Sequence, residues 1–217
     1  MSGCSSSTRR LRPHQSLITW LLIAPLSWGC GESLDPHSPD GALRSFAQTV
    51  IQGSSAEIYA QLSAPSKVAL TDLAELSRVL NKRVDALPLK TQAWARAEAM
   101  PPWMSERADL SPERVFEELA KDMIKAMRAA PSDEVMQSFN GQRIVFEDAK
   151  EGVVSLKTRG FPQLKMRKEG ELWRFAELEE ALTLAVEAAH MNIKMIESNK
   201  AEIQRRQRLD LPMPKAP

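Results

Sequence analysis

The spacing of apolar residues changes twice along the chain, and these changes constrain the fold more than any other feature. From residue 39 to about residue 131, apolar residues recur every three or four positions, which is typical of amphipathic helices. Between residues 143 and 175 they form short runs separated by turns, as in β-hairpins. From Glu177 to about Arg208 the helical spacing returns. This order predicts an α+β domain followed by a long C-terminal helix.

Two predicted helices begin with the same signal. The segments Ser38-Pro39-Asp40 and Ser111-Pro112-Glu113 each place serine at the N-cap, proline at the first helical position and an acid in the first turn. The first helix is expected to end at Gly53 and the second just before Pro131. Their predicted buried faces are Leu43, Phe46, Ala47, Val50 and Ile51 in the first, and Val115, Phe116, Leu119, Met123 and Met127 in the second.

The region between these helices is predicted to be mostly helical. A short helix carries Ile58, Tyr59 and Leu62 and ends at Pro65. A third helix is predicted to be capped by Ser66, with Val68, Leu73, Leu76 and Leu80 on one face. Residues 87–110 are expected to hold a helix over roughly residues 90–99 and a loop. Trp94 and Trp103 there are interpreted either as plugs that anchor the loop or as a lid over a cavity.

Four short strands are predicted, over residues 143–147, 153–158, 163–167 and 172–175, and they form an antiparallel meander. Alternation in the third strand places Leu164 and Met166 on the inner face. Trp173 in the last strand is expected to bury its ring against the first helix, near Phe46 and Val50.

The C-terminal helix over residues 177–208 has an apolar seam with alternating steps of four and three. It consists of Leu182, Val186, Ala189, Ile193, Ile196, Lys200 and Ile203. Two interpretations stay open. The seam over residues 182–203 docks a protein partner or a second copy of the chain, or it covers the sheet of its own domain.

Three stretches resemble the NTF2-like (SnoaL-like) superfamily of α+β cones. Residues 39–53 look like its opening helix, residues 57–63 like the segment that follows, and residues 166–175 like its closing hairpin. The resemblance implies N-terminal helices on a curved antiparallel sheet of about four strands. It also implies a frequent role as a small bacterial envelope lipoprotein. It implies no reaction, because the superfamily contains both enzymes and proteins that are not enzymes.

The N-terminus looks like a bacterial export signal. Arg9, Arg10 and Arg12 precede an apolar run over residues 17–28, which is too short for a membrane-spanning helix. Gly29-Cys30 resembles the end of a lipobox, which implies cleavage before Cys30 and a lipid on its sulfur, with palmitate among the acyl chains. The alternatives are a secreted protein with a free Cys30 and an uncleaved anchor.

These features predict the domain boundaries and the compartment. A signal peptide (1–29) precedes a tether (30–39), an NTF2-like domain (40–176), a long amphipathic helix (177–208) and a disordered tail (209–217). The expected location is the cell envelope, at the outer membrane or at the periplasmic face of the inner membrane.

Composition limits the partners and the stabilising chemistry. Cys4 and Cys30 are the only cysteines, so the exported domain holds no internal disulfide. The chain has 29 basic and 28 acidic residues. Residues 1–29 carry three arginines and no acid, so the chain without them has 26 basic and 28 acidic residues. This balance does not favour nucleic-acid binding.

The sequence shows no motif of a hydrolase, a kinase or a thiol enzyme. Tyr59 is interpreted as core packing, and Glu118 with Asp122 as a solvated face. His37 and His190 are too scattered for a metal site. The methionines Met123, Met127, Met191 and Met195 are interpreted as core filling rather than as an adaptable groove.

We therefore predict no catalytic residue, no metal site and no bound cofactor. The expected function is a membrane-tethered lipoprotein whose domain binds a partner or a small ligand without catalysis. The alternative is an isomerase-like or cyclase-like enzyme that acts on a small apolar substrate. A cavity lined by an ionisable side chain with a positioned partner would favour the enzyme.

Overall fold

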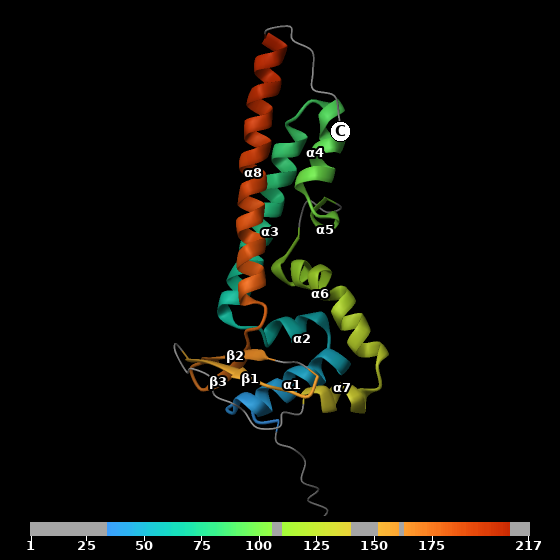
Figure 1. Cartoon of the computed structure of the whole chain (residues 1–217), viewed down its shortest axis with the longest axis vertical. Helices are drawn as coiled ribbons and strands as arrows, with labels where there is room; N and C mark the ends of the chain where they lie inside the picture. Colours follow the sequence, from blue (N-terminus) through green and yellow to red (C-terminus); the bar gives the residue numbers. More distant parts are fainter. Residues whose placement is uncertain (1–33, 106–109, 140–151, 161–162, 209–217) are drawn as a thin grey trace, which may run out of the picture. The chain divides into compact units, whose positions relative to one another are not determined.

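The computed structural model describes residues 34–105, 110–139, 152–160 and 163–208 (Figure 1). Within these ranges the fold is α+β, as predicted: seven helices, a three-stranded antiparallel sheet and a C-terminal helix. The helices are α1 (Pro39–Gln52), α2 (Ser55–Ala60), α3 (Ala64–Asp85), α4 (Leu89–Ala99), α5 (Pro102–Ser105), α6 (Pro112–Ala129), α7 (Ser132–Phe139) and α8 (Glu179–Arg208), and the strands are β1 (Val153–Leu156), β2 (Leu164–Glu169) and β3 (Leu172–Phe175). The predicted strand over residues 143–147 lies outside the described residues.

Helix α1 begins as predicted. The Ser38 side chain accepts a hydrogen bond from the backbone N–H of Gly41 at 3.1 Å, which satisfies one of the free donors of the first turn. A Cβ atom on Gly41 would lie 2.3 Å from the carbonyl oxygen of Asp35, so the entering chain requires a glycine here. The predicted inner face is confirmed: Leu43, Phe46, Ala47 and Val50 are buried, and Ile51 is half-buried.

Helix α3 begins three residues earlier than predicted. Ser63, and not Ser66, is its N-cap, and the Ser63 hydroxyl accepts a hydrogen bond from the backbone N–H of Ser66 at 3.4 Å. Pro65 therefore lies in the first turn of α3 and does not end α2. A proline is tolerated there because first-turn N–H groups have no partner within the helix. The same residue type can end one helix or begin the next, which is why the prediction was wrong.

The predicted faces of α3 and α6 are confirmed in part, since Leu73, Leu76 and Leu80 of α3 and Val115 and Phe116 of α6 are buried, but three predicted residues are exposed. Val68 of α3 is 60% exposed, and Leu119 and Met123 of α6 are 42% and 40% exposed. The buried residues are Ala69, Leu70, Leu73, Leu76, Ser77, Leu80 and Val84 in α3, and Val115, Phe116, Ala120 and Ile124 in α6. The buried faces also take in residues that the spacing did not predict, both large (Leu70, Ile124) and small (Ala69, Ala120).

The sheet has the order β1-β2-β3, and both neighbouring pairs are antiparallel. The strands β2 and β3 are joined by a two-residue turn in which Gly170 has φ +62°, a conformation that favours glycine. Leu164 and Met166 of β2 are buried, as predicted from their alternation. Met166 faces Phe175 across the β2–β3 pair.

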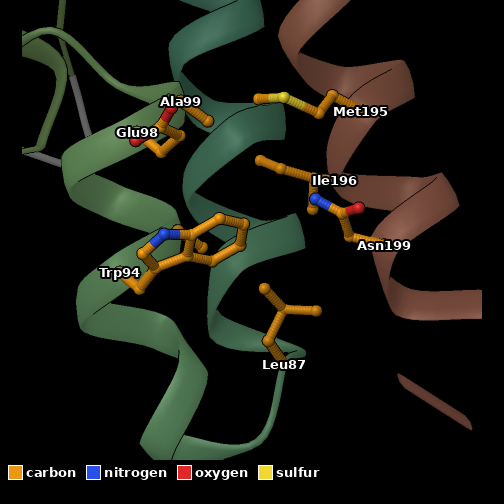
Figure 2. Close-up of a pocket in the computed structure, with 8 residues that line it drawn as sticks. Leu87, Trp94, Glu98, Ala99, Met195, Ile196 and Asn199 are labelled. Atoms are coloured by element: carbon orange, nitrogen blue, oxygen red, sulfur yellow. The ribbon is translucent and has the colours of Figure 1, made fainter. Parts of the chain in front are cut away.

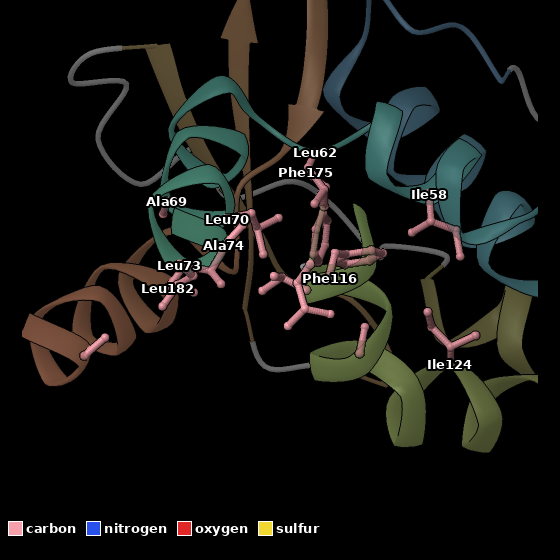
Figure 3. Packing of buried hydrophobic residues seen from close by; sticks show 14 of the residues in the cluster. Ile58, Leu62, Ala69, Leu70, Leu73, Ala74, Phe116, Ile124, Phe175 and Leu182 are labelled. Atoms are coloured by element: carbon pink, nitrogen blue, oxygen red, sulfur yellow. The ribbon is translucent and has the colours of Figure 1, made fainter. Parts of the chain in front are cut away.

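The end of β3 joins the sheet to the helices. The backbone N–H of Phe175 donates to the carbonyl oxygen of Gln61 at 3.0 Å, and the N–H of Ser63 donates to the carbonyl of Phe175 at 2.9 Å. The Phe175 ring stacks on Phe46 of α1, with centroids 4.0 Å apart. Figure 3 shows Phe175 beside Leu62 and Phe116 in the buried cluster.

This junction corrects the role predicted for Trp173. The ring that meets Phe46 belongs to Phe175, two residues further along the same face of β3, while Trp173 is half-buried. The backbone N–H of Trp173 donates to the carbonyl of Pro36 at 2.9 Å. Strand alternation indicates which residues share a face, but it does not indicate which of them lies closest to the helix.

Helix α8 packs along α3, and the two helices run in the same direction from the Leu62–Phe175 pairing (Figure 1). An ion pair of 3.1 Å between Arg83 and Glu197 joins them further along. The seam of α8 faces the helices of its own chain. Leu182, Ala189 and Ile196 are buried, Val186, Ile193 and Lys200 are half-buried, and the side chain of Ile203 lies outside the described residues. The expectation that the seam covers the sheet was therefore wrong, because the covering elements are helices.

Candidate functional site

Helix α8 exposes apolar side chains on the side opposite its seam. Leu184 is 59% exposed, Met191 is 63% exposed and Met195 is 36% exposed, and Ala188 between them is exposed too. Steps of four, three and four residues bring these four side chains to one face of a helix. We call these four residues the outer face of α8. Scattered exposed apolar residues are ordinary, whereas a continuous stripe indicates an interaction surface.

A shallow pocket adjoins the outer face where α4 approaches α8 (Figure 2). Its lining is almost entirely apolar: Leu87, Trp94, Ala95, Glu98, Ala99, Met195, Ile196 and Asn199. The amide of Asn192 holds the two helices together, because its Nδ2 donates to the carbonyl of Ala99 at 2.9 Å. The pocket has room for about one water molecule. It is therefore an edge of the α8 surface and not a chamber for a substrate.

The pocket does not have the composition expected for the enzyme alternative. Glu98 is its one carboxylate, and no histidine, tyrosine, lysine or second acid lines it. A general acid or base needs a partner that positions it or shifts its pKa. The arrangement supports contact with an apolar surface better than it supports proton transfer.

The interpretation of the methionines as core filling was wrong for three of the four. Met123, Met191 and Met195 are substantially exposed, and Met127 is half-buried against the core. Methionine side chains are flexible and polarizable, so an exposed row of them suits contact with another surface. The alternative interpretation, an adaptable contact surface, therefore fits Met191 and Met195 better than core filling does.

The two tryptophans are placed on helices and not in a loop. Trp94 belongs to α4 and Trp103 to α5, and both are half-buried against the hydrophobic core. This placement favours the reading as plugs over the reading as a lid. The indole N–H of Trp94 is buried and has no hydrogen-bond partner among the described residues.

Tyr59 packs against the core, as predicted from its spacing. Its ring lies 6.4 Å from that of Phe116, and the Nζ atom of Lys67 lies 5.8 Å from its centroid. Burial, and to a smaller extent the charge of Glu113, raises the pKa of the Tyr59 hydroxyl above its usual value. The hydroxyl stays protonated at neutral pH, and Tyr59 is a packing residue here.

The other titratable candidates lie apart from one another. Asp122 is exposed, and Glu118 lies 4.0 Å from the Nζ atom of Lys121, which fits the predicted solvated face. The exposed His37 has its Nδ1 3.0 Å from the carbonyl oxygen of Glu171, and His190 is exposed on α8. Across the described parts of the chain, no three metal-binding side chains gather.

A polar cluster fastens the start of α8 to β2 and α3. Arg167 donates to both carboxylate oxygens of Glu179, at 2.8 and 2.6 Å. Burial raises the pKa of Glu179, but hydrogen bonds from Arg167 and Ser63 and the charges of Arg167 and Lys165 outweigh it, so its pKa lies below the ordinary value. This two-bond ion pair orients α8 and therefore sets the direction of its outer face.

The predicted lipid-attachment residue, Cys30, lies outside the described residues, as do the basic segment and the apolar run before it. No helix that the structure describes combines the length and the hydropathy needed to cross a membrane.

The outer face of α8 was missed by sequence reasoning, although its signal was present. Its residues repeat with the same steps of four and three as the seam: Leu184, Ala188, Met191 and Met195. A contact surface was predicted from the sequence only for the seam, which is the more strongly apolar of the two stripes. Comparisons with protein-family models, with curated proteins and with solved structures find no match to this chain.

Proposed function

We propose that this chain is a lipoprotein of the bacterial cell envelope, tethered through Cys30, whose folded part is an interaction module and not an enzyme. The observation that supports the module most directly is the outer face of α8. There the chain exposes Leu184 and Met191 by about three fifths each, two turns apart on the same side of a long helix. A contiguous exposed apolar stripe is typical of surfaces that contact another molecule.

The way α8 is held supports the same function. The seam buries Leu182, Ala189 and Ile196 against helices of the same chain, so α8 is fixed along one side. The ion pair of Arg167 with Glu179 fixes its start, and that of Arg83 with Glu197 holds it further along. A binding surface on a rigid element loses less entropy on docking than one on a loop.

The proposal assigns the folded part to the NTF2-like cones. Its support is the order of elements, with α1, α2 and α3 ahead of antiparallel strands, and the position of β2 and β3 as a closing hairpin next to α1. The fourth strand of the cone stays a sequence prediction over residues 143–147, outside the described residues. The long α8 and the helices α4 and α5 would be additions to the minimal cone.

The tether is tested by membrane fractionation of the full-length protein expressed in a bacterium. Wild-type protein is expected in the membrane pellet after a high-salt wash, because a lipid anchor does not depend on charge. Cys30→Ala removes the acceptor sulfur and should move the protein to the soluble fraction. Cys4→Ala is the matched control, since Cys4 lies in the part removed with the signal peptide, and it should stay in the pellet.

Either of two results would contradict the lipoprotein. Cys30→Ala protein that stays membrane-bound at high salt would indicate an uncleaved anchor. Wild-type protein found in the soluble fraction would indicate secretion with a free Cys30. The length of the mature chain by mass spectrometry separates these cases, because cleavage before Cys30 removes residues 1–29.

A further inference from the structure

The outer face of α8 has the pattern of one side of a two-stranded coiled coil. In a heptad, Ala181, Ala188 and Met195 occupy one core position, and Leu184, Met191 and Ser198 occupy the other. All six side chains are exposed in the structure. The stripe from Ala181 to Ser198 is about 27 Å long at 1.5 Å per residue. It is therefore long enough to receive one further helix.

A second copy of the same stripe fits this one when the two helices run in opposite directions. In an antiparallel pair, the residue numbers of any two facing residues add up to the same total. Leu184 then faces Met195 of the second copy, Ala188 faces Met191, and Ala181 faces Ser198. Each layer joins a large side chain to a smaller or flexible one, or two small ones, so that no layer brings two bulky, rigid side chains together.

The charges beside the stripe favour the same arrangement. Glu187 and Lys194 are exposed on one edge of the outer face, seven residues apart. In the antiparallel pair, Glu187 of each copy lies next to Lys194 of the other, which gives two symmetric ion pairs. Other acids of α8 are engaged within the fold, since Glu179 binds Arg167 and Glu197 binds Arg83.

A parallel pair lacks this complementarity. The opposite edge of the outer face carries Ala185, Asn192 and Asn199, which have no charge. In a parallel coiled coil, Glu187 and Lys194 would face these residues and form no ion pair. The charge pattern therefore selects the antiparallel orientation.

The neighbouring helix leaves room for the second copy. The contacts of α4 with α8 described above involve Asn192, Met195, Ile196 and Asn199, which all lie beside or beyond the later half of the outer face along α8. In an antiparallel pair, the α4 of the second copy lies beside the first half of the stripe. The residues there are Ala181 and Ala185, whose side chains are single methyl groups.

We propose that two copies of this chain associate through the outer faces of α8 as an antiparallel, two-fold symmetric helix pair. The inference rests on the proposed function, and it names the partner of the interaction module. The interface has few large apolar side chains, so its intrinsic affinity is modest, with a dissociation constant on the order of micromolar. Attachment of both copies to one membrane raises their effective concentration and shifts the equilibrium further toward the dimer.

Site-specific crosslinking of the full-length protein in membranes tests the orientation. One tagged copy carries Leu184→Cys, a differently tagged copy carries Met195→Cys, and a short bismaleimide joins cysteines that face each other. The mixed pair is expected to give a dimer band, and each variant expressed alone is not. Protein without introduced cysteines measures the background from Cys4 and Cys30. Dimers formed by Leu184→Cys alone would indicate a parallel pair, and no dimer band in any combination would overturn the proposal.

Charge reversal tests whether the partner is a second copy. Glu187→Lys alone places like charges at both ion pairs, and so does Lys194→Glu alone. Each is expected to weaken self-association of the detergent-extracted protein about tenfold. The double variant restores both pairs with their signs exchanged, and should return to within about a factor of two of wild type. A double variant as weak as the single ones would overturn the proposal in favour of a different protein partner.

The two proposals fail separately. Crosslinking is scored in the membrane and the soluble fractions alike. With the soluble fraction concentrated well above the dissociation constant before crosslinking, loss of the tether moves the dimer band to that fraction, whereas loss of self-association removes the band from both fractions.

Discussion

Glu179 and Arg167 form the contact that holds the start of α8 against the sheet. Their side chains are only 19% and 23% exposed, and both carboxylate oxygens accept hydrogen bonds from the guanidinium. Because the pKa of Glu179 is depressed in the folded protein, its contribution to stability is present above the ordinary carboxyl value of 4.5. The contribution is lost as the pH falls through the lower folded-state pKa.

Glu179→Gln is expected to reduce the free energy of unfolding by about 1 kcal/mol at neutral pH. The difference from wild type should shrink in the acid range below pH 4.5, where the wild-type carboxylate becomes protonated. Urea unfolding at a series of pH values measures this. Glu180→Gln is the control, because the Glu180 side chain is 78% exposed and its contact with Lys165 is 3.5 Å long. A Glu179→Gln difference that stays constant down to strong acid would contradict the account.

Single residues were predicted well where local chemistry decides the outcome. Ser38 and Ser111 cap their helices, because an N-cap serine next to a proline satisfies backbone donors within four residues of chain. Ser63 was missed, since Ser66 is also followed by apolar residues at helical spacing. Phe175 was missed as the partner of Phe46, because their contact depends on how β3 meets α1, which no local pattern encodes.

At the scale of elements, α8 has two apolar stripes, of which the fold covers one and leaves the other exposed. Its seam is covered by α3 and α4, while its outer face is open. Sequence spacing predicts that both stripes exist, but not which of them the fold covers. That choice depends on α3, whose parallel course beside α8 follows from the pairing of Leu62 with Phe175, more than a hundred residues apart in the chain.

Adjacent residues on α8 should respond in opposite ways to the same substitution. Ala189 is 3% exposed in the seam, whereas its neighbour His190 is exposed and lies outside both stripes. Ala189→Glu buries a charge against α3 and is expected to lower the free energy of unfolding by about 3 kcal/mol or more. His190→Glu should change it by no more than about 0.5 kcal/mol. Thermal unfolding followed by circular dichroism compares the two, and equal melting temperatures would show that the seam is not covered.

At the scale of the whole molecule, we propose a tethered domain that presents one long helix held on one side by its own fold. The α+β class and the final long helix follow from the sequence, because the period of the apolar residues changes from helical to strand-like and back. The docking surface does not follow from the sequence, since exposure depends on how the helices assemble. Met191 illustrates this point: a methionine at helical spacing suits a core and a contact surface equally well, and only its 63% exposure decides between them.

The native mass of the full-length protein in gentle membrane extracts tests the central claim most directly. Met191→Glu and Val68→Glu make a matched pair, because the two side chains are 63% and 60% exposed and lie on different helices. Wild-type protein and Val68→Glu are predicted to run at the mass of a complex, and Met191→Glu at the mass of a single chain. Met191→Glu protein that keeps the wild-type mass, or wild-type protein that runs as a single chain, would contradict the claim that the outer face of α8 is the docking surface.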